Sequence, residues 1–309
     1  MKQRILLVGG SGQVGQILRR WLGESGHEIK NLSRQGADGW DGKHFGAWTE
    51  DLANCDVLIN LAGRSVDCRY YETNRRFMLD SRVHSTRILG EALAQTERRP
   101  RVWLNASTAT IYRHALDSPQ DERTGEIGGA EANAPATWRF SIEVATSWES
   151  AFFAAKVPGV RQVALRSAIT MSPDKGGVFS VLHRLVRWGF GGTLGSGRQM
   201  MSWIHEYDFC RAVEFLLERE DLDGAVNLTS PRPLPNADFM RLLREACRQP
   251  IGLPAMEWMI GIGAFILRTE SELVLKSRWV LPTRLEQAGF CFEYPEWGRA
   301  AADLVSRSR

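Results

Sequence analysis

The stretch ILLVGGSGQVGQILRRWL, residues 5–22, carries the strongest structural signal in the chain. Its apolar start (5–8) predicts a buried strand, and the apolar positions 14, 17, 18, 21 and 22 predict one face of a helix. A glycine turn between a strand and a helix lets the backbone approach a pyrophosphate, whose charge is favoured by free N–H groups and by the helix dipole. The stretch therefore predicts a dinucleotide site; the alternative is a packing turn in another kind of α/β protein. We expect the site to be lined by Gly9, Gly12, Gln13, Val14 and Gly15.

Strands and helices alternate beyond this stretch. Strands are predicted at residues 27–32, 56–63, 101–107 and 160–167, and helices at about 72–95 and 138–155. This alternation is typical of βαβ units, so we expect an α/β fold with a Rossmann-type, doubly wound parallel sheet. After about residue 170 the pattern loosens and becomes mostly helical. We therefore divide the chain into a dinucleotide-binding domain (1–170), to which some later segments can return, and a substrate-side region (171–309).

The composition is that of an ordinary globular domain, with 43% hydrophobic and 24% charged residues. Lys and Arg number 39 against 36 Asp and Glu, and this balance gives no reason to expect a nucleic acid partner. The five cysteines never form a C-x-x-C motif, which predicts buried free thiols, no metal site and a cytoplasmic location. Met1 leads directly into the first strand, which leaves no room for a signal peptide. The most apolar late segment, residues 255–267, is shorter than the roughly 20 residues that cross a bilayer, so we expect no membrane partner.

Motifs along nearly the whole chain resemble the extended branch of the short-chain dehydrogenase/reductase superfamily. They include GGSGQVG (9–15), NLAG (60–63), DSRVHST (80–86), NASTATIY (105–112), GSGRQMMSWIHEYD (195–208) and RWVLPTRLEQAGFCFEYP (278–295). Within that branch the chain resembles the epimerase family proteins that carry their own C-terminal domain of unknown function. The resemblance implies a nicotinamide cofactor and an oxidoreductase or epimerase-like activity.

The residues after the second predicted strand indicate which cofactor is bound. A site for NAD places Asp or Glu there to accept a hydrogen bond from the ribose 2′-OH, whereas this chain has Ser33 and Arg34. A guanidinium binds a 2′-phosphate bidentately, so we expect NADP(H) in preference to NAD(H). The alternative is that Arg34 is a solvated loop charge. We also expect the segment Asn60, Leu61, Ala62 and Gly63 to lie along the adenosine side of the cofactor.

The resemblance implies a catalytic Ser or Thr beside a Tyr-x-x-x-Lys pair on the next helix. Ser107 and Thr108 supply the hydroxyl, and alignment with sugar epimerases favours Thr108 as the substrate contact. The tyrosine and lysine are absent, because the two plausible registers place Phe140 with Val144, or Ser141 with Ala145, at their positions. The usual proton relay is therefore missing.

Several other residues are candidates for substrate binding. Arg82 stands where the superfamily often has Asn, and it is expected either to bind a substrate carboxylate or phosphate or to form a structural salt bridge with Asp80 or another nearby acid. His205 is either a general acid or a scaffold residue at the start of a helix. In relatives the tyrosine that corresponds to Tyr112 lines the substrate pocket. The run 195–203 suggests that this pocket is partly aromatic. The further candidates are therefore Tyr112, Gln199 and Trp203.

These observations leave three functions open. The first is an NADP(H)-dependent oxidoreductase or epimerase-like enzyme acting on a small polar carbonyl or sugar-like substrate. The second is an NADP(H)-binding sensor without turnover, which the loss of the Tyr-x-x-x-Lys pair favours. The third is a structural partner in an oligomer, for which the resemblance implies a homodimer formed through the two long helices.

Overall fold

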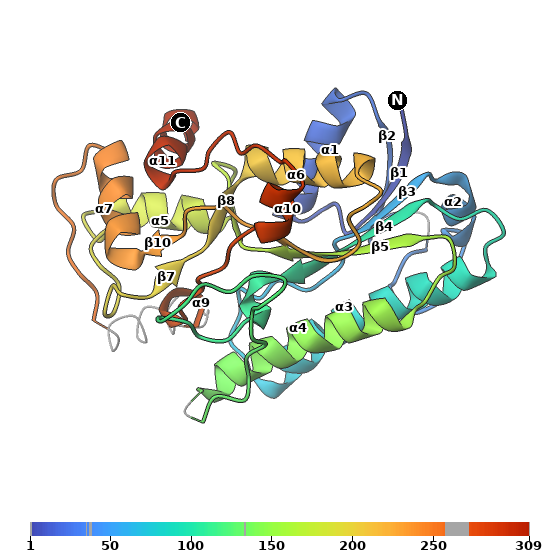
Figure 1. Cartoon of the computed structure of the whole chain (residues 1–309), viewed down its shortest axis with the longest axis horizontal. Coiled ribbons are helices and arrows are strands. Elements are labelled where there is room, and N and C mark those ends of the chain that lie inside the picture. Colours follow the sequence, from blue (N-terminus) through green and yellow to red (C-terminus); the bar gives the residue numbers. More distant parts are fainter. Residues whose placement is uncertain (1, 35, 37–38, 133, 257–271, 309) are drawn as a thin grey trace.

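A six-stranded parallel sheet forms the centre of the protein, in the strand order β2-β1-β3-β4-β5-β9 (Figure 1). The computed structural model describes residues 2–34, 36, 39–132, 134–256 and 272–308. The six strands are β1 (Arg4–Val8), β2 (Glu28–Leu32), β3 (Val57–Asn60), β4 (Val102–Thr108), β5 (Arg161–Ser167) and β9 (Gly224–Leu228). The predicted α/β fold with a Rossmann-type sheet is confirmed.

Helices cover both faces of the sheet because each buried strand is apolar on both sides. Ile5 and Leu7 of β1 belong to one hydrophobic core, which includes α1 (Gln13–Glu24) and α6 (Glu206–Glu218). Leu6 and Val8 belong to a second core on the other face, with α2 (Thr49–Asn54), α3 (Glu72–Gln95) and α4 (Ala136–Ala154). In Figure 1, α3 and α4 lie side by side below the strands, and α1 and α6 lie above them. This alternation of faces follows from the two-residue period of a strand.

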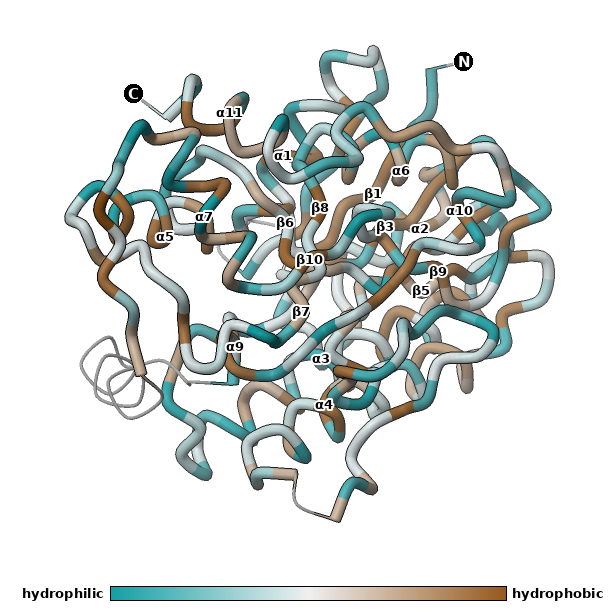
Figure 2. The backbone as a smooth tube through the Cα atoms, turned by 60° about the vertical axis from the view of Figure 1, so that its left-hand side comes forward, coloured by the Kyte–Doolittle hydropathy of each residue, from teal (hydrophilic) through white to brown (hydrophobic). Residues whose placement is uncertain are grey.

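The later part of the chain is mostly helical and contains two small sheets. β6 (Ile169–Met171) pairs with β8 (Trp203–His205), and β7 (Met200–Met201) pairs with β10 (Leu234–Pro235). Besides α6, the helices in the described residues of this part are α5 (Val178–Arg187), α7 (Asn236–Ala246), α9 (Glu272–Leu275), α10 (Thr283–Gln287) and α11 (Trp297–Arg307). Figure 2 shows α5, α7 and α11 together beside the central strands. They share a third core, whose largest members are Phe179, Trp203, Phe239 and Trp297.

One strand of this later part returns to the central sheet. β9 lies parallel to β5, with Val163 opposite Gly224 and Ser167 opposite Leu228. Arg284 of α10 holds this edge, because its Nη1 atom donates to the carbonyl oxygen of Ala225 at 2.7 Å. The edge of the sheet is therefore completed by residues far from its other strands in the sequence.

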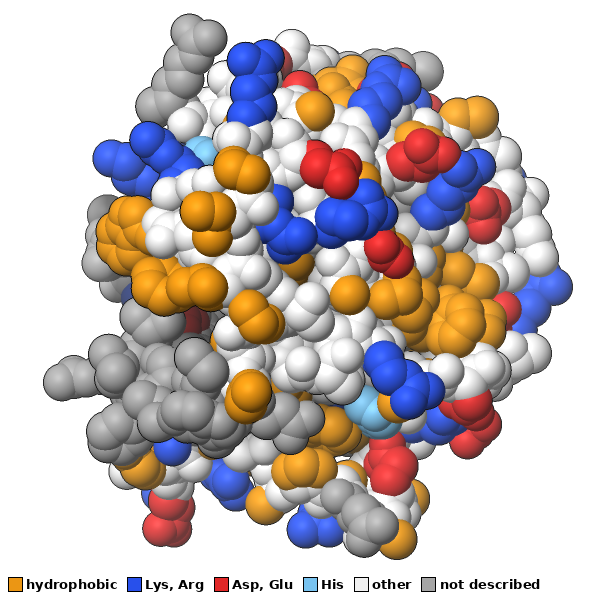
Figure 3. Space-filling model, turned by 90° about the vertical axis from the view of Figure 1, so that its left-hand side faces the viewer, with side chains coloured by type: hydrophobic (Ala, Val, Ile, Leu, Met, Phe, Trp, Pro, Cys, Tyr) orange, Lys and Arg blue, Asp and Glu red, His pale blue; other side chains and the backbone are white. Residues whose placement is uncertain are grey.

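The surface carries some exposed apolar side chains, and hydrophobic patches are visible on the face shown in Figure 3. The most exposed large ones include Trp188, Ile251 and Met256, at 66%, 60% and 63%. The five cysteines form no disulfide within the described residues, and they are not all buried as predicted, because Cys291 is exposed. Of the described helices, none combines the length and the apolar character that a membrane span requires. From residue 257 onward, the apolar segment 255–267 lies outside the described residues.

Candidate cofactor and substrate site

The glycine turn after β1 packs against the turn after β3. Gly9 has a φ of +80°, and a Cβ atom at this position would lie 2.8 Å from the backbone nitrogen of Ala62. Gly15 lets α1 start close to the turn, since a Cβ there would lie 2.5 Å from the Cα of Gly10. At Gly12 the nearest atom would be 3.8 Å away, and no side chain caps α1. The first turn of α1 is therefore open to an anion, as the predicted pyrophosphate site requires.

The same turn is joined to the end of β2. The backbone N–H of Gly9 donates to the carbonyl oxygen of Leu32 at 3.0 Å, so Ser33 and Arg34 follow directly beside the glycines. Arg34 is exposed, and within the described residues its guanidinium forms no hydrogen bond or ion pair. It is thus available to a phosphate group on a cofactor lying across the turn.

Asn60 supports this edge of the sheet through its side chain. The Asn60 Oδ1 atom accepts a hydrogen bond from the Ala62 backbone at 3.0 Å, and its Nδ2 atom donates to Asn105 Oδ1 at 2.7 Å. Asn60 is fully buried, and Leu61 packs against the core that includes α1 and α6. Among the residues predicted to contact the cofactor, Asn60 and Leu61 therefore fix the turn, Ala62 lies beside Gly9, and Gly63 lies against Arg82.

Gln13 has a donor that no described residue uses. Its Nε2 atom is buried without a hydrogen-bond partner, and its amide packs against Gly177, where a Cβ atom would clash with it. An unpaired buried donor at the first residue of α1 is suited to a ligand that carries oxygen acceptors. The residues present at this edge of the sheet therefore fit a dinucleotide.

The two hydroxyl residues at the end of β4 have different surroundings. Ser107 donates to Glu149 Oε1 at 2.5 Å, and Arg166 holds the same carboxylate through its Nε and Nη2 atoms at 2.8 and 2.7 Å. Ser107 is buried, so it belongs to this internal network and we leave it out of the proposed site. Thr108 is only partly buried, and its Oγ1 atom accepts from the backbone of Thr110 at 3.1 Å. Its hydroxyl hydrogen remains able to bind a substrate oxygen.

Tyr112 extends the buried network rather than lining a pocket. Its hydroxyl donates to Asn227 Oδ1 at 3.0 Å and accepts from Arg166 Nη1 at 2.9 Å. Only 1% of Tyr112 is exposed, so we also leave it out of the proposed substrate site.

Helix α4 has neither tyrosine nor lysine at the positions where the Tyr-x-x-x-Lys pair of the superfamily is expected. Phe140 and Val144 are buried in an apolar cluster between α3 and α4. Ala145 is fully buried beside η1 (Ala109–Ile111), a short 3-10 helix. Ser141 is the one polar residue of the four, and its hydroxyl donates to Glu272 Oε2 at 2.5 Å.

A tyrosine from a different element reaches Ser141. Tyr70, which precedes α3, is hydrogen-bonded to Ser141 and packs edge-on against Phe140, with 5.4 Å between the ring centroids. Burial raises the pKa of Tyr70 to about 12, so its hydroxyl keeps its proton at neutral pH. The sequence analysis did not include Tyr70 among the candidate residues.

The segment that contains α9 brings basic groups against the end of β4. Lys276 donates through Nζ to the carbonyl oxygen of Thr110 at 2.8 Å, and Arg278 donates through Nε to Thr110 Oγ1 at 3.0 Å. Arg278 also pairs with Glu272 at 3.7 Å. All three charged residues are buried. Lys276 and Arg278 hold the short helix that follows Thr108. The sequence analysis missed all three residues.

The remaining predicted substrate residues lie in structural positions. Trp203 is fully buried and packs against Trp297 at 4.9 Å, so it belongs to the third core and the prediction of an aromatic pocket at this residue is wrong. Gln199 is 3% exposed, and its amide donates to the carbonyl oxygen of Leu194 at 2.8 Å. It holds a loop.

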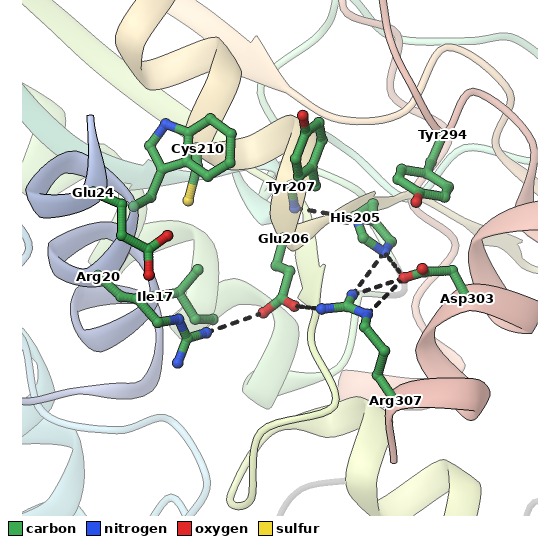
Figure 4. A pocket seen from close by; sticks show the side chains of 11 residues that line it. Ile17, Arg20, Glu24, His205, Glu206, Tyr207, Cys210, Tyr294, Asp303 and Arg307 are labelled. Atoms are coloured by element: carbon green, nitrogen blue, oxygen red, sulfur yellow. Dashed lines mark hydrogen bonds and ion pairs between the residues drawn. The ribbon is translucent and has the colours of Figure 1, made fainter.

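His205 caps α6 instead of facing Thr108. Its Nδ1 atom accepts from the Tyr207 backbone at 3.1 Å, and its Nε2 atom lies 3.0 Å from Asp303. Burial lowers the pKa of His205 to about 4, so the ring is neutral at pH 7. It borders a cavity of about 280 Å³ between α1, α6 and α11 (Figure 4). The scaffold interpretation of His205 fits these contacts, and the general-acid interpretation does not.

Arg82 of α3 lies over Gly63, on the same side of the sheet as α4. A Cβ atom at Gly63 would lie 3.1 Å from the Arg82 Cζ atom. The guanidinium thus reaches the turn that follows β3.

Within the described residues, no three His, Cys, Asp or Glu side chains are grouped to hold a metal ion.

Comparison with known proteins agrees with this architecture. The model of the NAD dependent epimerase/dehydratase family matches residues 5–228, and that of a domain of unknown function, DUF1731, matches residues 257–304. The chain therefore belongs to the NAD-dependent epimerase/dehydratase family. The resemblance to epimerase family proteins with their own C-terminal domain is confirmed.

Several similar proteins match over nearly the whole of this chain. The mouse epimerase family protein SDR39U1 is 30% identical over 313 residues, which cover 98% of this chain and 100% of that protein. The crystal structure of human SDR39U1 with NADPH has a TM-score of 0.83 at 27% identity and covers 98% of this chain and 99% of that one. A nucleoside-diphosphate sugar epimerase from Corynebacterium glutamicum has a TM-score of 0.77 at 26% identity and covers 99% of this chain and 58% of that one.

Proposed function

We propose that this protein is an NADP(H)-dependent oxidoreductase or epimerase-like enzyme that acts on a small polar carbonyl or sugar-like substrate. The observation that carries the proposal is the hydrogen bond from Gly9 to Leu32, which holds the glycine turn beside Ser33 and Arg34. The pyrophosphate would lie at the start of α1, and the Arg34 guanidinium would bind the 2′-phosphate. The human relative whose structure contains NADPH supports the same choice of cofactor.

The cofactor preference is tested by replacing Arg34. Arg34→Ala is expected to weaken NADPH binding by about 1–3 kcal/mol, because a charge-assisted contact is lost, and to leave NADH binding nearly unchanged. Fluorescence titration of the purified protein with both cofactors measures this difference. Arg19→Ala is a matched control, since Arg19 is exposed on α1. Equal weakening of NADPH and NADH binding by Arg34→Ala would contradict the proposed role.

For the chemical step we propose that Thr108 orients the substrate oxygen and that Tyr70 donates the proton. NADPH, when bound, would supply the hydride to the carbonyl carbon. The Tyr70 hydroxyl would pass its proton to the carbonyl oxygen, which yields an alcohol, and the phenolate would regain a proton from solvent. The location of Tyr70 beside Ser141, at the position of the missing tyrosine, supports this assignment. A panel of carbonyl compounds, monitored for loss of NADPH, tests for turnover.

The second function is an NADP(H) sensor without turnover. It is favoured by α4, which has Phe140 with Val144, or Ser141 with Ala145, where active members of the short-chain dehydrogenase/reductase superfamily are expected to have Tyr and Lys. A sensor is expected to bind reduced and oxidised cofactor with different affinities and to change the protease sensitivity of its C-terminal part. Equal affinities together with an unchanged digestion pattern would remove support for it.

A further inference from the structure

The guanidinium of Arg82 contacts two residues. A Cβ atom at Gly63 would be 3.1 Å from Arg82 Cζ, so the absence of a side chain at position 63 leaves room for the guanidinium. The same Cζ atom lies 5.0 Å from the ring centroid of Trp148, in a cation–π contact. These two contacts hold the guanidinium beside the turn that follows β3.

Arg82 has no acidic partner within the described part of the chain. Its Nη1 atom donates to the carbonyl oxygen of Met78 at 3.0 Å, and no other hydrogen bond of this side chain is formed there. Asp80, one expected salt-bridge partner, pairs with Arg76 at 3.5 Å. A guanidinium has five N–H donors, so most of those on Arg82 remain free. The alternative of a structural salt bridge with Asp80 is therefore wrong.

The surroundings of Arg82 favour binding of an anion. Burial lowers the pKa of Arg82 to about 10, which leaves the side chain charged at neutral pH but poorly solvated. The groups that act on it electrostatically are Tyr70 and Cys68, and both are weak acids that do not compensate a positive charge. A poorly solvated cation with free donors binds a carboxylate or phosphate more strongly than an exposed one does.

We propose that Arg82 binds an oxyanion of the substrate, so that the substrate is a carbonyl compound bearing a carboxylate or a phosphate group. This inference rests on the proposed function, because that function makes Tyr70 the proton donor to the substrate, and Tyr70 acts electrostatically on Arg82. The phosphates of the cofactor already have their own binding groups at the start of α1 and at Arg34. An anion at Arg82 is therefore supplied by the substrate, and Tyr70 lies close enough to interact with the same guanidinium.

Binding of small anions to the NADPH-loaded protein tests the proposal without knowledge of the substrate. The probes are oxalate and inorganic phosphate, and the readout is the fluorescence of bound NADPH during titration. We expect at least one probe to change this signal saturably in the wild type, with oxalate reporting a carboxylate site and phosphate reporting a phosphate site. Arg82→Gln is expected to weaken that binding at least tenfold and to change the Kd for NADPH less than twofold.

Two further variants keep the test decisive. Arg82→Lys retains the charge without the planar guanidinium and is expected to bind the probe with intermediate affinity. It replaces Arg82→Gln in the test if circular dichroism shows that Arg82→Gln is unfolded. Arg76→Gln, on the same helix but exposed, is expected to behave like the wild type. Loss of NADPH affinity in Arg82→Gln would assign Arg82 to the cofactor and overturn the proposal. The proposal would also be overturned if the wild type bound NADPH but neither oxalate nor phosphate changed the fluorescence signal. Absence of NADPH binding in the wild type would instead refute the proposed function.

Discussion

Ser141 of α4 and Glu272 of α9 are joined by a hydrogen bond of 2.5 Å, although 131 residues separate them in the sequence. Ser141 stands at one of the two positions where the catalytic tyrosine of the superfamily is expected. The C-terminal segment thus reaches the place from which the usual proton donor is missing. Together with Tyr70 it gives this region a polar character that α4 alone does not provide.

The proposed role of Tyr70 predicts a specific loss. Tyr70→Phe is expected to lower kcat for carbonyl reduction about 10²–10⁴-fold, because the donated proton is removed while the ring and its packing remain. NADPH binding is expected to stay unchanged. Steady-state kinetics with any substrate found in the panel gives the first quantity, and fluorescence titration gives the second. Tyr71→Phe is the control, since Tyr71 is 63% exposed. A kcat for Tyr70→Phe close to that of the wild type would rule out the assignment.

Lys276 predicts a dependence of stability on pH. Burial, followed by the charge of Arg278, lowers its pKa to about 7 from the usual 10.5. Between these values the unfolded chain binds a proton that the folded chain does not, so the free energy of unfolding rises with pH from about 7 to 10.5. The slope from this group reaches at most about 1.4 kcal/mol per pH unit.

Urea unfolding at several pH values from 7 to 9 measures the effect. Lys276→Met is expected to have a smaller slope than the wild type, because the group that changes protonation is absent. Lys175→Met, at an exposed position, is expected to keep the wild-type slope. Identical slopes in all three proteins would show that Lys276 retains an ordinary pKa.

The pair of Glu149 and Arg166 predicts a large effect on stability. Both side chains are nearly buried, and Arg166 contacts the carboxylate through two nitrogen atoms. Glu149→Ala leaves a buried guanidinium without its partner and is expected to lower the free energy of unfolding by about 3–5 kcal/mol. Glu143→Ala, at an exposed position of the same helix, is expected to change it by less than about 0.5 kcal/mol. Urea denaturation measures both, and equal stabilities would contradict the prediction.

We propose that the outer surfaces of α3 and α4 pair two copies of the chain. A groove of about 880 Å³ runs between these helices, and it is lined by small side chains of α4 and by charged side chains of α3. Ala154→Arg adds a bulky charge to the groove and is expected to convert a dimer to a monomer in sedimentation experiments. Ala302→Arg, at an exposed position of α11, is the control. A wild-type protein that is monomeric at micromolar concentration would exclude this pairing.

The local pattern predicted most of the fold. The helix expected at residues 72–95 has those bounds, because its apolar stripe packs on a sheet whose strands were also predicted. Gly9 could be assigned from its position alone, since a turn between a strand and a helix requires its backbone conformation.

The candidate substrate site was harder to predict, because it is assembled from distant segments. Tyr70 and Glu272 meet at Ser141 only after the chain has folded, and no local spacing marks either of them. The sequence also did not show which of the two hydroxyl residues at the end of β4 would be available to a substrate. Consecutive strand residues point to opposite faces of the sheet, so Ser107 bonds to Glu149 and Thr108 does not. For Trp203 the local pattern was misleading. Its place in a motif suggested a substrate contact, but the side chain is fully buried in the core.

Because β9 returns to the central sheet, the first 170 residues are not expected to fold on their own. Without β9, the backbone N–H and C=O groups along one side of β5 would lose their partners, and a fragment ending at residue 170 would present an open edge to other molecules. Such a fragment is expected to aggregate when produced alone. The C-terminal half of the chain is therefore expected to protect the open edge of β5 during folding.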